Sequence, residues 1–206
     1  MLNRETKRLM LEGELEKATD KIEDEKLRLI VRGFLANQIP QYFLTMTASG
    51  SQQYHPAEMN VEGGLFIHNL AMLECMEDMI KGVNGTRLPL YEVDILRVAI
   101  LIHDAFKYGT QKDYERMAKK KAVRATADHG QLVANEFAKF AKGKLPSKTI
   151  KDICMSVEKH MGIYDSIPNQ GMDVFWILSV SDYIVSRKGH HSKEAKRVAK
   201  MLEDKV

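Results

Sequence analysis

Histidine and aspartate residues in or beside apolar helical stretches are the part of this sequence best suited to chemistry. Burial of an imidazole or a carboxylate without a partner costs on the order of several kcal/mol. A shared divalent cation removes that cost, because neutral imidazole and ionised carboxylate are good ligands for such ions. One such histidine alone is more often a satisfied core residue, but an ordered series of them indicates a metal centre. The series is His68, His103, Asp104, His129, His160 and Asp182.

The stretches that must position these residues have the apolar spacing of helices, and no strand pattern is convincing, so the fold class is predicted to be all-α. The run VAILI at 98–102 is apolar on all sides and predicts a central buried helix over 91–109. Trp176 is expected to pack in the core, and the stretch 111–126 gives no clear prediction. Further helices are predicted over 64–82, 129–143, 147–162, 173–189 and 190–206.

The length of 206 residues suits a single-domain helical bundle. Proline is scarce, at 5 residues, and no Ser/Gly-rich linker divides the chain. We expect an N-terminal helical segment, 1–40, that braces the bundle, a metal-binding domain, 41–189, and a C-terminal amphipathic helix, 190–206. The charge-rich start of the first segment is either a helix of its own or an extension of the helix around Leu27–Phe34.

The order of these residues resembles the HD-domain superfamily, in its branch with the pattern His, His-Asp, His, His and a final Asp that binds two metals. Three local matches carry the resemblance: GGL before His68, LIHDAFKYG around the His-Asp pair, and SDYIVS around Asp182. The resemblance covers roughly residues 54–187. It implies a helical bundle of HD-domain type and a metal-dependent phosphohydrolase.

The resemblance also implies a role for each ligand. His68, His103, Asp104 and Asp182 hold the first ion. Asp104 bridges to a second ion, which His129 and His160 complete. The cofactors are then two divalent metal ions, with a bridging hydroxide as nucleophile, and histidine-rich ligation favours Mn, Fe, Co, Ni or Zn over Mg.

Other residues are candidates for substrate binding. Lys107 aligns with the lysine of the family signature and is expected to bind a phosphate or a leaving oxygen, although a lysine at a helix end also extends its ammonium into water. His55, in QQYHPAEMN, either lines the pocket or is an ordinary loop histidine. Lys120, Lys121 and Arg124 belong to a basic run that either attracts phosphate or is a solvated helix face.

The predicted function is cleavage of a phosphoester or phosphodiester bond in a nucleotide, a cyclic dinucleotide or a short oligonucleotide. Two alternatives stay open. Some HD proteins use the same ligands for a mixed-valence di-iron oxygenase, which is one alternative for this chain. The other is a non-catalytic nucleotide-binding HD module. No G-x-x-x-x-G-K loop and no GxSxG elbow is present, which disfavours those other routes to phosphate binding and hydrolysis.

The formal net charge of +3 and pI of about 8.7 are too mild to imply nucleic-acid binding by themselves. The expected partner is a phosphorylated small molecule or nucleotide, with short single-stranded nucleic acid left open. Cys75 and Cys154 form no paired framework, the N-terminus is too charged for a secretory signal, and no apolar run approaches about 20 residues. We therefore expect a cytoplasmic protein without a membrane partner, and the apolar stripes of its terminal helices permit a homo-oligomer.

Overall fold

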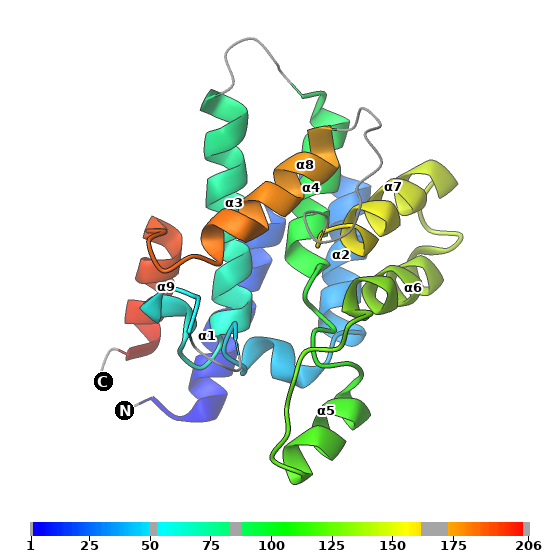
Figure 1. Ribbon diagram of the computed structural model, residues 1–206. Coiled ribbons are helices and arrows are strands. Elements are labelled where there is room, and N and C mark those ends of the chain that lie inside the picture. The colour runs from blue at the N-terminus through cyan, green and yellow to red at the C-terminus, as the bar shows by residue number, and fades with distance from the viewer. Residues whose placement is uncertain (1, 50–52, 83–87, 162–172, 204–206) are drawn as a thin grey trace.

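The computed structural model describes residues 2–49, 53–82, 88–161 and 173–203 (Figure 1). Within these ranges the regular structure is helical and forms one bundle without strands, which confirms the prediction of an all-α fold. Short 3-10 helices, η1 (Gln41–Leu44) and η2 (Ala57–Met59), precede α3. The α-helices are α1 (Arg4–Thr19), α2 (Glu25–Asn37), α3 (Gly64–Gly82), α4 (Leu90–Ile102), α5 (Gln111–Lys119), α6 (His129–Ala141), α7 (Ser147–Glu158), α8 (Asp173–Val185) and α9 (Lys193–Glu203).

The centre of the bundle is formed by α3 and α4, which pack against each other. Residues 64–73 of α3 are buried, as is most of 94–102 in α4. Helices α8 and α9 pack on α3, and α7 and α8 pack on α4 (Figure 1). A short connection joins α6 to α7, and the two helices pair closely as an αα-hairpin. Polar side chains that arise from α3 and α4 are therefore held largely away from water.

The N-terminal segment consists of two separate helices, which resolves the alternative left open by the sequence. Asn3 and Asp24 cap α1 and α2, because each side chain accepts a hydrogen bond from a backbone N–H three residues later. Glu14 in α1 forms an ion pair with Arg197 in α9, so the first and last α-helices are tied together. The domain boundaries after residues 40 and 189 stay predictions.

The helix predicted over 91–109 ends earlier, at Ile102. The residues that follow form successive tight turns, with N–H to carbonyl distances of 2.9 Å for Ala105 to Ile102 and 3.0 Å for Lys107 to Asp104. The carbonyl of Ile100, near the end of α4, accepts a hydrogen bond from the imidazole of His103. Side-chain competition for a helical carbonyl favours such a break. Lys107 is therefore not one helical turn beyond His103, as the sequence suggested, but lies in a turn.

Two further local predictions differ from the structure. Trp176 is 57% exposed, so its assignment to the core was wrong. Helix α8 is apolar on more than one face, and the inward face carries Val174, Leu178 and Val185 instead. Helix α7 ends at Glu158, which leaves His160 in the turn beyond it.

None of the helices in the described part of the chain is both long and apolar enough to cross a membrane. The two cysteines are free thiols; Cys75 is buried and Cys154 is half-buried.

Candidate metal centre

One group of possible ligands joins α3, the end of α4 and α8. His68 lies in the middle of α3, His103 directly follows α4, and Asp182 lies in α8. The His68 Nε2 atom is 3.1 Å from the Asp182 Oδ1 atom, and the rings of His68 and His103 lie 5.7 Å apart. One ligand atom from each residue lies within 4.8 Å of the others, so the three can hold one metal ion.

A second group lies beside the first and joins the end of α4 to the α6–α7 hairpin. Asp104 Oδ1 is 3.2 Å from His129 Nε2, which in turn is 3.1 Å from His160 Nε2. His129 begins α6 and His160 follows α7, so the hairpin brings together residues that are far apart in the chain. These three residues also offer ligand atoms within 4.8 Å of one another.

Asp104 connects the two groups. Its Oδ1 atom faces His129, whereas its Oδ2 atom is 3.7 Å from His103 Nε2 and 2.6 Å from the ammonium of Lys107. The rings of His103 and His160, one from each group, are 5.0 Å apart. Two ions held by the two groups would therefore be neighbours, with Asp104 between them.

Backbone hydrogen bonds orient three of the four histidines. The Nδ1 atoms of His103, His129 and His160 lie 2.9, 2.7 and 2.6 Å from the backbone carbonyl three residues earlier. Since a carbonyl only accepts, each Nδ1 carries the proton and each Nε2 lone pair points into the centre. Hydrogen bonds of this kind are the usual second contact of metal-bound imidazoles.

The same tautomers supply a test of whether the residues fit metal ions. The Nε2 atoms of His129 and His160 are both acceptors at 3.1 Å, and they repel unless a cation or a proton lies between them. The Nε2 atom of His103 and the Nδ1 atom of His68 are buried without a hydrogen-bond partner among the described residues. Divalent ions would satisfy these atoms, so the donor set fits them.

The charges of the centre also suit cation binding. Burial opposes ionisation of Asp104, but Lys107 and the neighbouring imidazoles outweigh it and hold the pKa of Asp104 well below its ordinary value. Burial likewise opposes ionisation of Asp182, and the hydrogen bond from His68 outweighs it and lowers the Asp182 pKa. Burial lowers the pKa of His103 to about 4. Burial also lowers the pKa of His160, whereas the hydrogen bond and the charge of Asp104 outweigh burial and raise the pKa of His129. At neutral pH the centre thus presents ionised carboxylates together with neutral imidazoles at His103 and His160, and these are metal-binding forms.

Two glycines, Gly64 and Gly130, permit the close approaches on which the centre depends. A Cβ on Gly64 would lie 1.9 Å from the Met59 carbonyl oxygen, so only glycine lets α3 begin against η2. A Cβ on Gly130 would lie 2.6 Å from the Val157 carbonyl oxygen. That carbonyl is the one that orients His160. The sequence reasoning noted the glycines before His68 but missed Gly130, whose close contact is with a different helix.

A cleft of about 520 Å³ opens onto the centre. Among the described residues, Asp104, His129, His160 and Asp182 form part of its wall, and Lys107 and His55 line it too. Sequence reasoning missed the aromatic and basic residues of its rim, although Tyr183 directly follows Asp182. These rim residues are Tyr54, Tyr183 and Arg187.

His55 is 8% exposed, and neither ring nitrogen has a hydrogen-bond partner among the described residues. Its ring lies 5.3 Å from that of His68. Burial, reinforced by nearby His68 and Lys107, lowers the pKa of His55 to about 3, so the ring is neutral at pH 7. Lys107 keeps its charge, because Asp104 outweighs the effect of burial and raises the Lys107 pKa.

The structure does not bring the predicted basic residues into the cleft. Lys120, Lys121 and Arg124 are exposed, at the end of α5 and in the connection that follows it, and none lines the cleft. Ala125, the next residue along, does line it.

No protein-family model matches the chain, and neither the curated proteins nor the solved structures contain a match. What the fold and the site define is an all-helical bundle with two adjoining, buried His/Asp groups that could bind metal ions.

Proposed function

We propose that the protein is a metal-dependent phosphohydrolase of HD-domain type. The substrate is a nucleotide, a cyclic dinucleotide or a short oligonucleotide, in which a phosphoester or phosphodiester bond is cleaved. The observation that carries the proposal is the connection of the two ligand groups through Asp104, at a cleft that also holds the ammonium of Lys107.

Each residue of the centre has a place in this function. His68, His103, Asp104 and Asp182 hold one ion, and Asp104, His129 and His160 hold the other. Nitrogen-rich ligation favours Mn, Fe, Co, Ni or Zn over Mg. When bound, the two ions would supply a water-derived nucleophile at neutral pH and offset the negative charge that develops on the phosphoryl group.

Lys107 and His55 are proposed to bind the substrate. The Lys107 side chain is 18% exposed and lines the cleft, so its ammonium can contact a phosphate oxygen while it stays beside Asp104. The neutral ring of His55 has a free N–H, which can donate to a phosphate or leaving-group oxygen without adding charge. These contacts orient a phosphate against the metal centre.

The rim of the cleft supports a nucleotide as the substrate. Tyr54 and Tyr183 are 59% and 43% exposed, and both line the cleft. The Arg187 guanidinium lies 4.0 Å from the centre of the Tyr183 ring. Exposed aromatic faces and a guanidinium are suited to stacking on a base and to a phosphate contact. The cleft volume of about 520 Å³ lies within the range typical of small-molecule sites.

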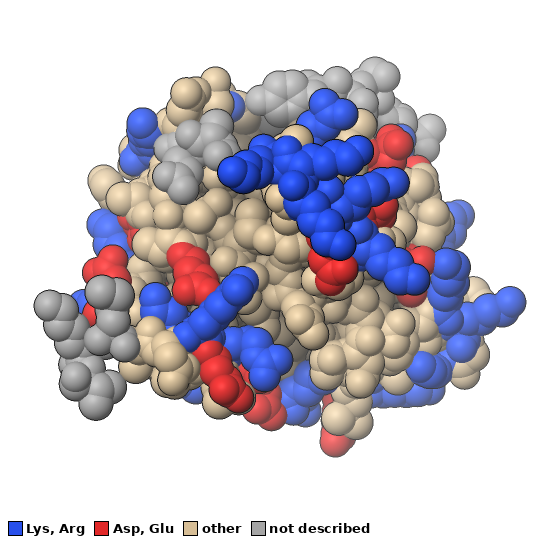
Figure 2. Space-filling view, turned by 90° about the horizontal axis from the view of Figure 1, so that it is seen from below, with Lys and Arg blue, Asp and Glu red and all other residues tan. Residues whose placement is uncertain are grey.

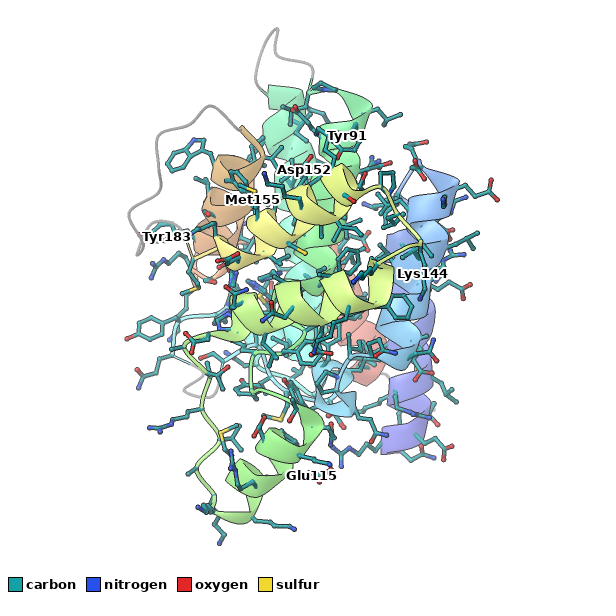
Figure 3. All side chains as sticks on the ribbon, turned by 90° about the vertical axis from the view of Figure 1, so that its right-hand side faces the viewer. Tyr91, Glu115, Lys144, Asp152, Met155 and Tyr183 are labelled. Atoms are coloured by element: carbon teal, nitrogen blue, oxygen red, sulfur yellow. The ribbon has the colours of Figure 1, made fainter. Side chains whose placement is uncertain are left out.

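The test combines metal analysis with an activity assay. The protein, purified without chelator, is analysed by elemental spectrometry and incubated with Mn²⁺ and a panel of nucleotides, cyclic dinucleotides and short oligonucleotides. We expect about two transition-metal ions per chain and metal-dependent hydrolysis of at least one class. The matched control is Asp152→Ala, because Asp152 on α7 pairs with Lys148 on the same helix and with Tyr91 at the start of α4 (Figure 3), and it does not line the cleft. The proposal would be refuted if the wild-type protein held no metal, or if Asp152→Ala lost its metal as Asp104→Ala does. Two iron ions per chain without hydrolysis would favour the oxygenase.

A further inference from the structure

Helix α5 belongs to a segment of the chain that leaves the metal centre after Lys107 and returns to it at Thr126. It has no buried residue, and only Tyr114 and Met117 pack partly against the core. A capping box between Thr110 and Asp113 fixes its start. The segment ends at Thr126, whose backbone N–H donates to the carbonyl of Lys107 at 2.9 Å. Burial of apolar surface by α5 therefore contributes little to the stability of the bundle. We look to the exposed side chains of α5 for its function.

The exposed side of α5 is strongly basic. Lys112, Arg116 and Lys119 follow helical spacing on one face, and Lys120, Lys121 and Arg124 continue the charge beyond the helix. We call these six residues the α5 strip. Figure 2 shows Lys and Arg side chains gathered on the face that α5 presents when the molecule is seen from below.

Most of this positive charge is not neutralised by the protein itself. Arg116 pairs with Asp113 at 2.9 Å, but the five other members of the α5 strip form no ion pair with any described residue. By contrast, Lys139 and Lys148 on other helices each pair with a carboxylate at 2.6 Å. Unneutralised like charges held close together repel one another, and a polyanion relieves this repulsion.

The backbone at Lys121 adds a second, independent observation. Helix α5 ends in a motif in which Ala122 N–H donates to Met117 and Lys121 N–H donates to Ala118. The residue in the left-handed position of this motif is usually glycine, but here it is Lys121, with φ of 53°. A lysine in a strained position that suits glycine is a reason to look for a function of its side chain.

The α5 strip leads directly to the metal centre. Its last member, Arg124, is followed by Ala125, which lines the cleft. The next residue, Thr126, bonds through its N–H to Lys107 and through its carbonyl to the imidazole of His129. In Figure 3, Tyr183 at the rim of the cleft and the connection between α5 and α6 lie along the same edge of the molecule.

We propose that the α5 strip binds the backbone phosphates of a single-stranded oligonucleotide whose scissile phosphodiester lies in the cleft. This inference deepens the proposed phosphohydrolase function and rests on it for the place of the scissile bond. Phosphate contacts of this kind position a strand without reading its sequence. Binding is then expected to be independent of base sequence and to weaken with salt.

The first experiment measures binding without turnover. Chelator-treated full-length protein is titrated against a fluorescein-labelled single-stranded octanucleotide, followed by fluorescence anisotropy at several NaCl concentrations. Each phosphate contact on a single strand contributes about 0.7 to the slope of log K against log salt. The triple variant Lys120→Gln, Lys121→Gln and Arg124→Gln should therefore lower the slope by about 2 and the affinity at 0.1 M salt by about a hundredfold.

The matched control removes the same charge elsewhere. The control variant carries Lys139→Gln, Lys142→Gln and Lys144→Gln, near the end of α6 that is remote from His129. Figure 3 shows Lys144 at the opposite edge of the molecule from Tyr183. This control should bind the octanucleotide like the wild type. Equal loss in both triple variants would mean that net charge alone governs binding and would overturn the proposal. It would also be overturned if the protein bound vesicles of phosphatidylserine and phosphatidylcholine through the α5 strip but did not bind the oligonucleotide.

Turnover separates this inference from the proposed function. The α5 triple variant should hydrolyse bis(p-nitrophenyl) phosphate, a small diester, at the wild-type rate, while kcat/KM for oligonucleotides falls. If oligonucleotide binding depended on the α5 strip but no substrate were hydrolysed, the proposed phosphohydrolase function would be refuted and the proposed binding surface would be supported. If both triple variants hydrolysed oligonucleotides with equal kcat/KM, the phosphohydrolase function would be supported and the α5 strip would be refuted as the binding surface.

A single substitution distinguishes binding from a structural role of Lys121. Lys121→Gly supplies the residue that the left-handed backbone favours, so the melting temperature should not fall. Affinity for the octanucleotide should nevertheless fall about fivefold, the share of one phosphate contact at 0.1 M salt. An unchanged affinity would show that Lys121 does not contact the strand.

Discussion

Substitution of Gly130 by alanine tests whether the close approach of α6 to the end of α7 builds the second ligand group. The added Cβ would lie 2.6 Å from the Val157 carbonyl oxygen, where ordinary contact begins at 3.4 Å, so the helices must part by about 0.8 Å. The same Cβ would lie 3.2 Å from His160 Nδ1. Because the Val157 carbonyl also orients His160, the substitution disturbs both the packing and the ligand.

Two magnitudes follow from this geometry. Overpacking of a tight contact costs about 1–3 kcal/mol, which for a chain of this size lowers the melting temperature by about 2–12 °C. Displacement of the partner that orients a metal-bound histidine costs about 10–100-fold in metal affinity. The Gly130→Ala protein should therefore stay folded but bind its second ion more weakly than the first.

The assay is thermal unfolding of the chelated protein, followed by calorimetric titration with Mn²⁺. Gly13→Ala in α1 is the matched control, because a Cβ there meets nothing within 4 Å. That control should gain about 0.5–1 kcal/mol, as alanine does over glycine within a helix, and should bind metal normally. If Gly130→Ala lost stability but bound both ions like the wild type, the approach of the helices would not position His160, and our reasoning would be wrong.

Further predictions concern the ligands and the helix ends. Asp104→Ala should abolish hydrolysis and most metal binding, since Asp104 reaches both ligand groups; normal metal content by elemental spectrometry would contradict this. His129→Gln and His160→Gln should each leave about one ion per chain in a folded protein, and two ions in both variants would place the second site elsewhere. For Glu14, the hydrogen bond from Arg197 outweighs burial and lowers the pKa of Glu14 from 4.5. The stability from its ionised form is therefore full above pH 4.5 and is lost as the pH falls further. In urea titrations, Glu14→Gln should be about 1–2 kcal/mol less stable than the wild type at pH 7, and this difference should shrink as the pH falls below 4.5; a difference that did not change with pH would contradict the role of the charge.

The fold class and the clustering of the His and Asp residues could be predicted from the sequence. The helix expected over 64–82 matches α3 at both ends, because glycine residues mark its start and its stop. His68 and His103 stood out because polar residues within an apolar run on a buried helix need partners. The resemblance to the HD-domain superfamily implied which of the ligand residues meet. The structure brings His68, His103 and Asp182 together in one group, and Asp104, His129 and His160 in a second.

The features that could not be predicted from the sequence depend on competition between local and tertiary contacts. The apolar pattern continues past Ile102, but the imidazole of His103 donates a hydrogen bond to the Ile100 carbonyl, and the α-helix ends at Ile102. Trp176 is exposed because α8 is apolar on several faces, and periodicity does not say which of them faces inward. The role of Gly130 depends on a helix that lies beyond the α6–α7 connection, so no local pattern shows it.

The ligands lie on segments that are distant along the chain, from His68 in α3 to Asp182 in α8, and only the folded state presents them together. An ion bound in the proposed way therefore stabilises the folded state by mass action, by about 2.7 kcal/mol per site when free metal is a hundredfold above Kd. Unfolded protein is the form that proteases degrade. The abundance of this protein in a cell would then follow the supply of transition metal, and metal starvation would remove the protein as well as its activity.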